Sequence, residues 1–183
     1  MNIDQAVLNF FVNNRFEWLT FVMLVITYSG SYLIVSGLTF LSAISFYIHK
    51  HYIKILPLII SVGGAAVTTA ILKIIVNRGR PPFADMLYLE TDPSFPSGHA
   101  TAAMALYGFL IYAIWKLDKH HLKNPLIFFL LALIILVGIS RLYLGVHYLS
   151  DVLAGYAVGL IWILIGVIVD RKTRKLLSWK PKI

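Results

Sequence analysis

The sequence contains no cysteine, which excludes disulfide scaffolds, thiolate zinc sites, iron–sulfur clusters and cysteine nucleophiles. Charge is also scarce. Only 13% of the 183 residues are charged, and Asp plus Glu number 8 against 16 Lys plus Arg. A soluble domain is typically about a quarter charged, because its surface must stay in water. This composition therefore excludes a soluble globule, a disordered chain and a coiled coil.

Hydrophobic residues make up 59% of the chain, and the mean hydropathy is +0.81. Several apolar runs approach the roughly 20 residues that a helix needs to cross a bilayer. The sequence therefore predicts an all-α, multi-pass transmembrane helix bundle. We expect five spans, with six as the alternative. The five lie at residues 32–48, 53–76, 100–115, 125–140 and 149–169.

The first 30 residues form a segment of different character. Apolar Ile3, Val7 and Phe10 recur at helical spacing among polar residues, a pattern typical of a helix lying in the membrane interface. The apolar run at 18–28 is too short to span before Ser29, and no basic start or cleavage site indicates a signal peptide. We expect one membrane-embedded domain, 1–183. Its parts are an interfacial segment 1–30, a transmembrane core 31–170 and a basic tail 171–183.

Basic residues divide into two sets along the predicted spans. One set of eleven comprises Lys50, Lys54, Lys116, Lys119, Lys123, Arg171, Lys172, Arg174, Lys175, Lys180 and Lys182. The other set of five comprises Arg15, Lys73, Arg78, Arg80 and Arg141. Because cytoplasmic loops carry the excess of Lys and Arg, the larger set and the C-terminus are predicted to be cytoplasmic. Loops 77–96 and 141–148 then face outward together, and the tail with Trp179 anchors the last helix at anionic lipid.

Two further patterns each have two interpretations. The His49/His51 and His120/His121 pairs could bind a metal, but such histidines are more often part of a solvated turn. Gly155 and Gly159 form a G-x-x-x-G face, which indicates either dimerisation or close packing within the chain.

Ionisable residues near the outer ends of the spans are the informative feature, because such groups are costly at membrane depth and are usually functional. Six share this face: Lys73, Arg80, His99, Arg141, His147 and Asp151. A helix continuing to Pro81 would put Lys73, Asn77 and Arg80 on one side.

The next span begins with Ser97 and Gly98. Ser97 can cap the helix and Gly98 admits a ligand close to the backbone, so the helix start is an anion site. His147 and Asp151 are four residues apart, a spacing at which the carboxylate can hold the imidazole.

This group of three cations, a helix start, two histidines and one carboxylate best fits a tetrahedral phosphate. Arginine offers paired donors to its oxygens. One histidine can attack phosphorus and the other can protonate the leaving oxygen. Three cations would repel a divalent metal, so we expect no catalytic metal and no cofactor.

Three motifs carry a family resemblance. They are Lys73-(six residues)-Arg80-Pro81, Pro96-Ser97-Gly98-His99 and Ser140-Arg141-(five residues)-His147-(three residues)-Asp151. Complete and in order, they resemble the signature of the type 2 phosphatidic acid phosphatase superfamily, which includes the vanadium haloperoxidases. The resemblance covers residues 73–151 by motif.

The resemblance implies a role for each matched residue. Five would bind the phosphoryl oxygens: Lys73, Arg80, Ser97, Gly98 and Arg141. His147 would be the nucleophile that forms a phosphohistidine, supported by Asp151. His99 would be the general acid that later activates water.

A membrane lipid phosphatase, acting on a monoester or pyrophosphate at the outer face of a bacterial inner membrane, is the function that the resemblance implies. Its small bacterial members act on undecaprenyl pyrophosphate, phosphatidylglycerol phosphate or lipid A 1-phosphate. The expected partners are a lipid phosphate and the bilayer, with no nucleic acid and no obligate protein.

The motifs recognise the phosphate group and not the lipid that carries it, so they do not determine the exact substrate. Headgroup selectivity is expected from outer-loop residues Asp85, Tyr88, Glu90 and Asp92. The alternatives are a vanadate-dependent peroxidase and a non-catalytic transporter of anionic lipid or phosphate.

Overall fold

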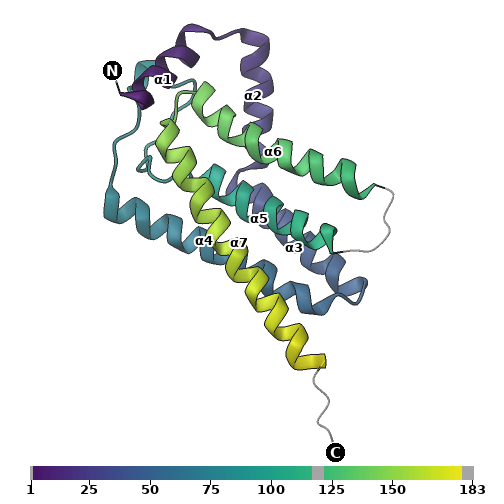
Figure 1. The fold of residues 1–183 in the computed structure, drawn as a ribbon. Helices are drawn as coiled ribbons and strands as arrows, with labels where there is room; N and C mark the ends of the chain where they lie inside the picture. Colours follow the sequence, from purple (N-terminus) through teal and green to yellow (C-terminus); the bar gives the residue numbers. More distant parts are fainter. Residues whose placement is uncertain (1, 117–121, 179–183) are drawn as a thin grey trace, which may run out of the picture.

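The computed structural model describes residues 2–116 and 122–178, and these residues are helical with connecting loops (Figure 1). The elements are α1 (Ile3–Asn13), α2 (Glu17–Ser29), α3 (Tyr32–Ile48), η1 (Tyr52–Lys54), α4 (Ile55–Val76), η2 (Phe83–Asp85), α5 (Gly98–Trp115), α6 (Lys123–Tyr143) and α7 (Leu149–Ser178). The all-α prediction is confirmed.

Four of these helices are long and apolar enough to cross a membrane: Tyr52–Val76, Gly98–Trp115, Lys123–Tyr143 and Leu149–Leu177. α2 and α3 pass the same test only together, as a pair bent by 48°. Counting that pair as one span gives the expected five. The described parts of the chain offer no further helix for the alternative of six.

The first span differs from the prediction, which placed it at 32–48 alone. α3 has 17 residues and is therefore about 25 Å long, shorter than the roughly 30 Å hydrocarbon core. The run at 18–28, which we expected to be too short to span, lies in α2, and α2 passes the test for a span only as the bent pair with α3. α2 ends at Gly30, and the Ser31 hydroxyl accepts from the Ile34 N–H at 3.4 Å to start α3. The interfacial position of α1 stays a prediction.

α7 continues nine residues beyond the predicted end at 169, to Ser178. No glycine or proline interrupts residues 167–178, and lysine and arginine favour helix. Arg174 Nε also lies 2.9 Å from Asp170 Oδ2, an ion pair one turn apart that supports this extension. The rest of the predicted tail, with Trp179, Lys180 and Lys182, lies outside the described residues. So do Lys119, His120 and His121.

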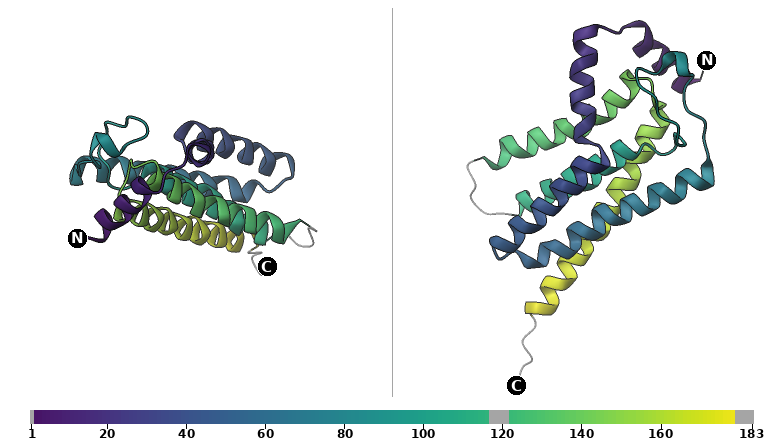
Figure 2. Two further views of the ribbon diagram at one scale, coloured as in Figure 1. Left: turned by 90° about the horizontal axis from the view of Figure 1, so that it is seen from above. Right: turned by 180° about the vertical axis from the view of Figure 1, so that it is seen from behind.

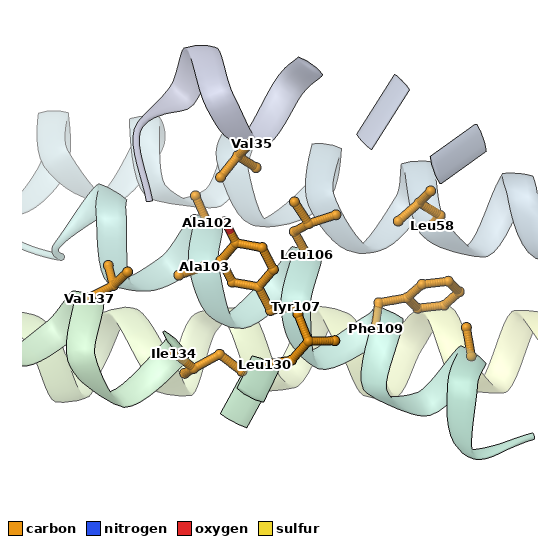
Figure 3. Close-up of a cluster of buried hydrophobic side chains, with 11 residues drawn as sticks. Val35, Leu58, Ala102, Ala103, Leu106, Tyr107, Phe109, Leu130, Ile134 and Val137 are labelled. Carbon is orange, nitrogen blue, oxygen red and sulfur yellow. The ribbon is translucent and has the colours of Figure 1, made fainter. Parts of the chain in front are cut away.

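α5 forms the centre of the bundle and packs against α4, α6 and α7. Its Leu106, Tyr107 and Phe109 lie within a buried apolar cluster that also takes Val35 from α3 and Leu58 from α4 (Figure 3). The Tyr107 hydroxyl donates to the Ser29 carbonyl oxygen at 2.6 Å, which satisfies its one polar group and ties α5 to the α2–α3 break.

The G-x-x-x-G face of α7 packs inside the molecule. A Cβ on Gly155 would lie 2.7 Å from the Ser97 carbonyl oxygen, and one on Gly159 would lie 2.7 Å from Met104 Cβ. Both contacts are with α5 or the residue that begins it. Of the two interpretations, close packing within the chain is therefore the one that the structure shows.

The described members of the two predicted sets of basic residues lie at opposite ends of the bundle. α1, the start of α2 and the loop between α4 and α5 gather at one end, where Arg15 donates to the Asp85 carbonyl oxygen at 2.5 Å (Figure 2). The end of α7, with Arg171 and Lys175, lies at the other end (Figure 1).

Candidate active site

All eight predicted site residues lie at the end of the bundle near the N-terminal helices. They come from four helix ends and two loops: Lys73 (α4), Arg80 (the α4–α5 loop), Ser97, Gly98 and His99 (the start of α5), Arg141 (α6), His147 (the α6–α7 loop) and Asp151 (α7). A cavity of about 230 Å³ opens among them, lined by Tyr32, Lys73, Arg80, Glu90, Asp92, Gly98, His99 and His147. Both histidines therefore face one cavity.

His147 is buried, and its two ring nitrogens face different groups. Nδ1 lies 3.5 Å from Asp151 Oδ2, close enough for electrostatic pairing but not for a good hydrogen bond. Nε2 lies 3.3 Å from Arg80 Nη1. A guanidinium can only donate, so Nε2 is the acceptor and the ring proton sits on Nδ1, towards Asp151. Burial, together with the charges of Arg141 and Arg80, lowers the pKa of His147 well below its usual range and keeps it neutral.

Arg80 reaches the cavity from a loop. The prediction that it lies on a continuation of the α4 helix is therefore wrong. α4 ends at Val76 because Asn77 adopts the left-handed conformation, with φ 44° and ψ 44°, and its N–H closes the helix onto the Lys73 carbonyl oxygen at 3.0 Å. Asparagine tolerates this conformation and is a recurrent helix terminator. Arg80 Nη1 then donates to the Val146 carbonyl oxygen at 2.7 Å, which fixes the guanidinium beside His147.

Each of the three predicted phosphate-binding cations is paired with a carboxylate of the α4–α5 loop. Arg141 Nη2 and Arg80 Nη2 bind the two oxygens of Glu90, the second at 2.7 Å. Asp92 lies 2.7 Å from both Arg80 and Lys73. Burial raises the pKa of Glu90, but Arg141 and Arg80 outweigh it and hold that pKa at about 2.

Three of the four loop residues expected to give selectivity therefore contact the cations, because Arg141 Nη1 also donates to the Tyr88 hydroxyl. The Tyr88 hydroxyl in turn donates to Glu90 at 2.9 Å, and burial raises the pKa of Tyr88 to about 12. The fourth, Asp85, forms no ion pair with Lys73, Arg80 or Arg141. Its backbone carbonyl oxygen instead accepts a hydrogen bond from Arg15.

The start of α5 presents an unused hydroxyl. Ser97 occupies the N-cap position, but its side chain makes no capping bond, contrary to expectation. Ser97 Oγ is buried and has no hydrogen-bond partner among the described residues. The Ser97 N–H donates to the Asp151 carbonyl oxygen at 3.0 Å, so the two helix starts are joined. A Cβ on Gly98 would lie 2.3 Å from Tyr32 Oη, so glycine here allows the Tyr32 side chain to lie directly against the start of α5.

Sequence reasoning missed two residues that reach the site, Arg78 and Asp4. Arg78 Nη1 donates to Asp151 Oδ1 at 2.7 Å, and its Nη2 donates to Asp4 Oδ2 at 2.8 Å. Asp4 also accepts from the N–H of Ser150 at 2.9 Å and so caps the start of α7 from α1. The available signals were weak, namely one acidic residue in α1 and a second arginine beside the motif.

A second cavity of about 460 Å³ adjoins the first between α2 and the α4–α5 loop. Its walls are largely apolar and aromatic, and it shares His99 and Glu90 with the smaller cavity. It is lined by Leu24, Thr27, Tyr28, Ser31, Leu87, Tyr88, Glu90 and His99. A ligand with a polar head in the smaller cavity could therefore place an apolar part here, beside His99.

Metal-binding groups are not evident in the part of the chain that the structure describes. Residues 2–116 and 122–178 contain no cluster of three or more His, Asp or Glu side chains placed to hold an ion. At the far end of the bundle, His49 Nδ1 lies 2.8 Å from the Ser45 carbonyl oxygen of its own helix. Such a contact with the preceding helical turn is typical of a residue that ends a helix.

Known proteins resemble this chain over most of its length. Phosphatidylglycerophosphatase B of Bacillus subtilis (strain 168) is 34% identical over 177 residues, which cover 94% of this chain and 85% of that protein. The crystal structure of the first transmembrane PAP2 type phosphatidylglycerolphosphate phosphatase from Bacillus subtilis gives a TM-score of 0.84 at 32% identity, covering 92% of this chain and 85% of that one.

A second crystal structure, Aquifex aeolicus LpxE, gives a TM-score of 0.74 at 25% identity, covering 92% of this chain and 96% of that one. The family model described as PAP2 superfamily matches residues 54–175, which include all eight predicted site residues. The chain is therefore a multi-pass membrane lipid phosphatase and belongs to the PAP2 superfamily.

Proposed function

We propose that this enzyme hydrolyses the terminal phosphate of phosphatidylglycerol phosphate through a phosphohistidine on His147. The observation that carries the proposal is the environment of His147 Nε2. This atom is unprotonated, faces the cavity and lies beside Arg80, while the other ring nitrogen faces Asp151. A neutral nitrogen in this position can attack phosphorus, and Asp151 stabilises the cation that forms.

The other site residues divide between phosphate binding and proton transfer. Lys73, Arg80 and Arg141 would hold the phosphoryl oxygens, with the unpartnered Ser97 hydroxyl and the Gly98 N–H at the start of α5. His99 lines the same cavity and would protonate the leaving oxygen, then activate the water that releases phosphate.

The cavity beside His99 accounts for a lipid substrate. A general acid must lie next to the leaving group, so the alcohol of the substrate would point into the 460 Å³ cavity with its apolar walls. Phosphatidylglycerol phosphate is our first choice because it is the substrate in the name of the 34% identical relative. Undecaprenyl pyrophosphate and lipid A 1-phosphate remain candidates for comparison.

The proposed reaction needs no metal, because the three cations already supply positive charge to the phosphate. The decisive experiment assays the purified enzyme on the three lipids side by side in a chelator, with identification of each product. Release of inorganic phosphate with phosphatidylglycerol as the main lipid product is the expected result. Turnover that a chelator abolished and a divalent ion restored would refute the metal-free mechanism.

The same assay separates the alternatives. A peroxidase would oxidise bromide when vanadate is added, and a transporter would bind lipid phosphates without releasing phosphate. Inhibition of phosphate release by vanadate is the expected outcome for a phosphatase, since vanadate mimics the five-coordinate transition state.

We also propose that the site faces outward and the C-terminus is cytoplasmic, as the distribution of basic residues predicts. The absence of cysteine makes a direct test available. A single cysteine at exposed Ala84, introduced as Ala84→Cys, should react with a membrane-impermeant maleimide in intact cells. Lys50→Cys at the opposite end should react only after the membrane is opened. The reverse pattern would overturn the orientation.

A further inference from the structure

Glu90 lies where a bound phosphate would contact the two arginines. Its Oε1 forms an ion pair with Arg141 Nη2, and its Oε2 lies 2.7 Å from Arg80 Nη2. The same Oε2 is 3.9 Å from Nε2 of His147, the nitrogen that we propose attacks phosphorus. The carboxylate of Glu90 thus takes up the contacts that two phosphoryl oxygens would otherwise make.

Asp92 continues this arrangement to the third cation. One of its oxygens lies 2.7 Å from Arg80 Nη2 and the other 2.7 Å from Lys73 Nζ. Burial raises the pKa of Asp92, but the hydrogen bonds from Lys73 and Arg80 outweigh it and hold that pKa at about 2. Three cations and two carboxylates leave one net positive charge in the cavity, too little to balance a phosphate dianion.

We propose that Glu90 and Asp92 are selectivity residues that occupy the phosphate site as internal counter-ions. A phosphate monoester dianion displaces them from the three cations, whereas a singly charged phosphodiester does not. This inference rests on the proposed function, because it takes the phosphate site to lie among Lys73, Arg80 and Arg141.

The physical reason is competition for the same donors. A phosphate monoester carries about −1.5 to −2 charges at neutral pH and offers three strong acceptor oxygens. A phosphodiester carries one charge, so it cannot replace two ionised carboxylates without a net loss of ion pairing. Phosphodiester headgroups are the ordinary surface of a phospholipid membrane. A site of three unpaired cations would fill with them, and the two carboxylates would prevent this.

The two side chains can leave the cations while the loop stays in place. The loop is anchored on either side of them, where the Leu87 N–H donates to the Leu144 carbonyl oxygen at 3.0 Å and the Ser94 N–H donates to the Arg78 carbonyl oxygen at 2.9 Å. The Asp92 side chain is 57% exposed and can turn to solvent. Glu90 also lines the 460 Å³ cavity, so a rotated Glu90 has space there.

The test compares Glu90→Gln and Asp92→Asn with the wild-type enzyme in mixed micelles. Glu17→Gln is the control, because Glu17 is an exposed carboxylate at the start of α2 that forms no ion pair with the three cations. Two inhibition constants are measured, one for inorganic phosphate and one for phosphatidylglycerol, with the lipid product quantified by chromatography.

Glu90→Gln should lower the inhibition constant of phosphatidylglycerol by about tenfold, the worth of a hydrogen bond between charged groups, and that of inorganic phosphate by less. Asp92→Asn should lower the constant of phosphatidylglycerol by about threefold because Asp92 is more exposed. Glu17→Gln should change neither by more than about twofold. Weaker or unchanged inhibition in both Glu90→Gln and Asp92→Asn would overturn the inference and make the carboxylates positioning groups for the cations. Should Glu90→Gln fail to fold, Asp92→Asn alone decides.

The proposed function fails in a different way. A wild-type enzyme that released no phosphate from any lipid would refute it directly. Normal wild-type turnover with no gain of inhibition in the variants would refute only the role of the two carboxylates.

Discussion

Buried charges occur at both ends of the bundle, but they are arranged differently. At the far end Lys54 is 3% exposed and donates to the Ala113 carbonyl oxygen at 2.9 Å, while buried Asp170 accepts from Tyr112 at 2.7 Å and from Arg174 at 2.9 Å. These groups all belong to helices, with partners from η1, α5 and α7. They therefore hold the helices together.

At the site end the charges line a cavity, and two of the carboxylates come from a loop. Arg141 and Arg80 belong to separate elements, and Glu90 binds both of them. A buried charge is tolerated only when it is paired. The far end satisfies that requirement with groups that pack permanently, whereas the site end satisfies it with groups that a ligand can replace. Function is accordingly expected at the site end and stability at the far end.

The largest difference between the ends should come from His147, the histidine proposed to attack phosphorus. His147→Ala removes the proposed nucleophile, and we expect kcat to fall by about 10³-fold or more. The matched control is His49→Ala at the far end, which should leave kcat within about twofold. Phosphate release is the measurement, and an active His147→Ala enzyme would refute the phosphohistidine.

Arg141→Lys should be the next most severe change, with kcat/KM lower by about 10²-fold, because one ammonium cannot replace a planar fork of donors. Arg141 uses that fork in the structure, with Nη1 on Thr27 at 2.9 Å and Nη2 on Glu90. The control is Arg174→Lys at the far end, where the side chain is 49% exposed. Equal losses in the two variants would mean that the ends do not differ as proposed.

A smaller effect is expected from the contacts that hold Asp151 in place. Arg78→Lys and Asp4→Asn should each lower kcat by about tenfold with little change in KM, because both act through the position of Asp151. Since the two residues contact each other, the double variant should lose little more than either alone. Glu17→Gln, in the same N-terminal region but exposed, is the control. Additive losses, or a rise in KM alone, would contradict a positioning role.

Asp170→Asn should have the smallest effect on activity, but it should still lower the stability of the folded protein. Weakening its contacts with Tyr112 and Arg174 should cost about 1–3 kcal/mol and lower the Tm in detergent by several degrees. The kcat measured well below the Tm should stay within about twofold. Loss of kcat without loss of Tm would assign the far end a role in catalysis.

The sequence could single out the eight candidate site residues, which the structure places at one end of the bundle, because the information is local. Lys73 and Arg80 are seven apart, His147 and Asp151 are four apart, and hydropathy places each of them at the end of a span. Helix boundaries were harder to predict. Asn77 ends α4 through a left-handed conformation, and neither this nor the pairing of α2 with α3 can be read from hydropathy alone.

Long-range contacts were beyond sequence reasoning altogether. Asp4 and Arg78 are 74 residues apart, and nothing in either neighbourhood indicates the other. The sequence predicted Glu90 as a loop residue that contributes to headgroup selectivity, but not as the group that bridges Arg80 and Arg141.

The sequence by itself determined that this protein is an all-α membrane protein and which of its few charged residues lie near the ends of apolar runs. These properties follow from composition and short spacings, because apolar runs must avoid water and neighbours along a helix share a face. Only the tertiary structure decided which carboxylate meets which cation and which nitrogen of His147 faces the cavity. Those pairings depend on how the helix ends and the loop between α4 and α5 come together in space.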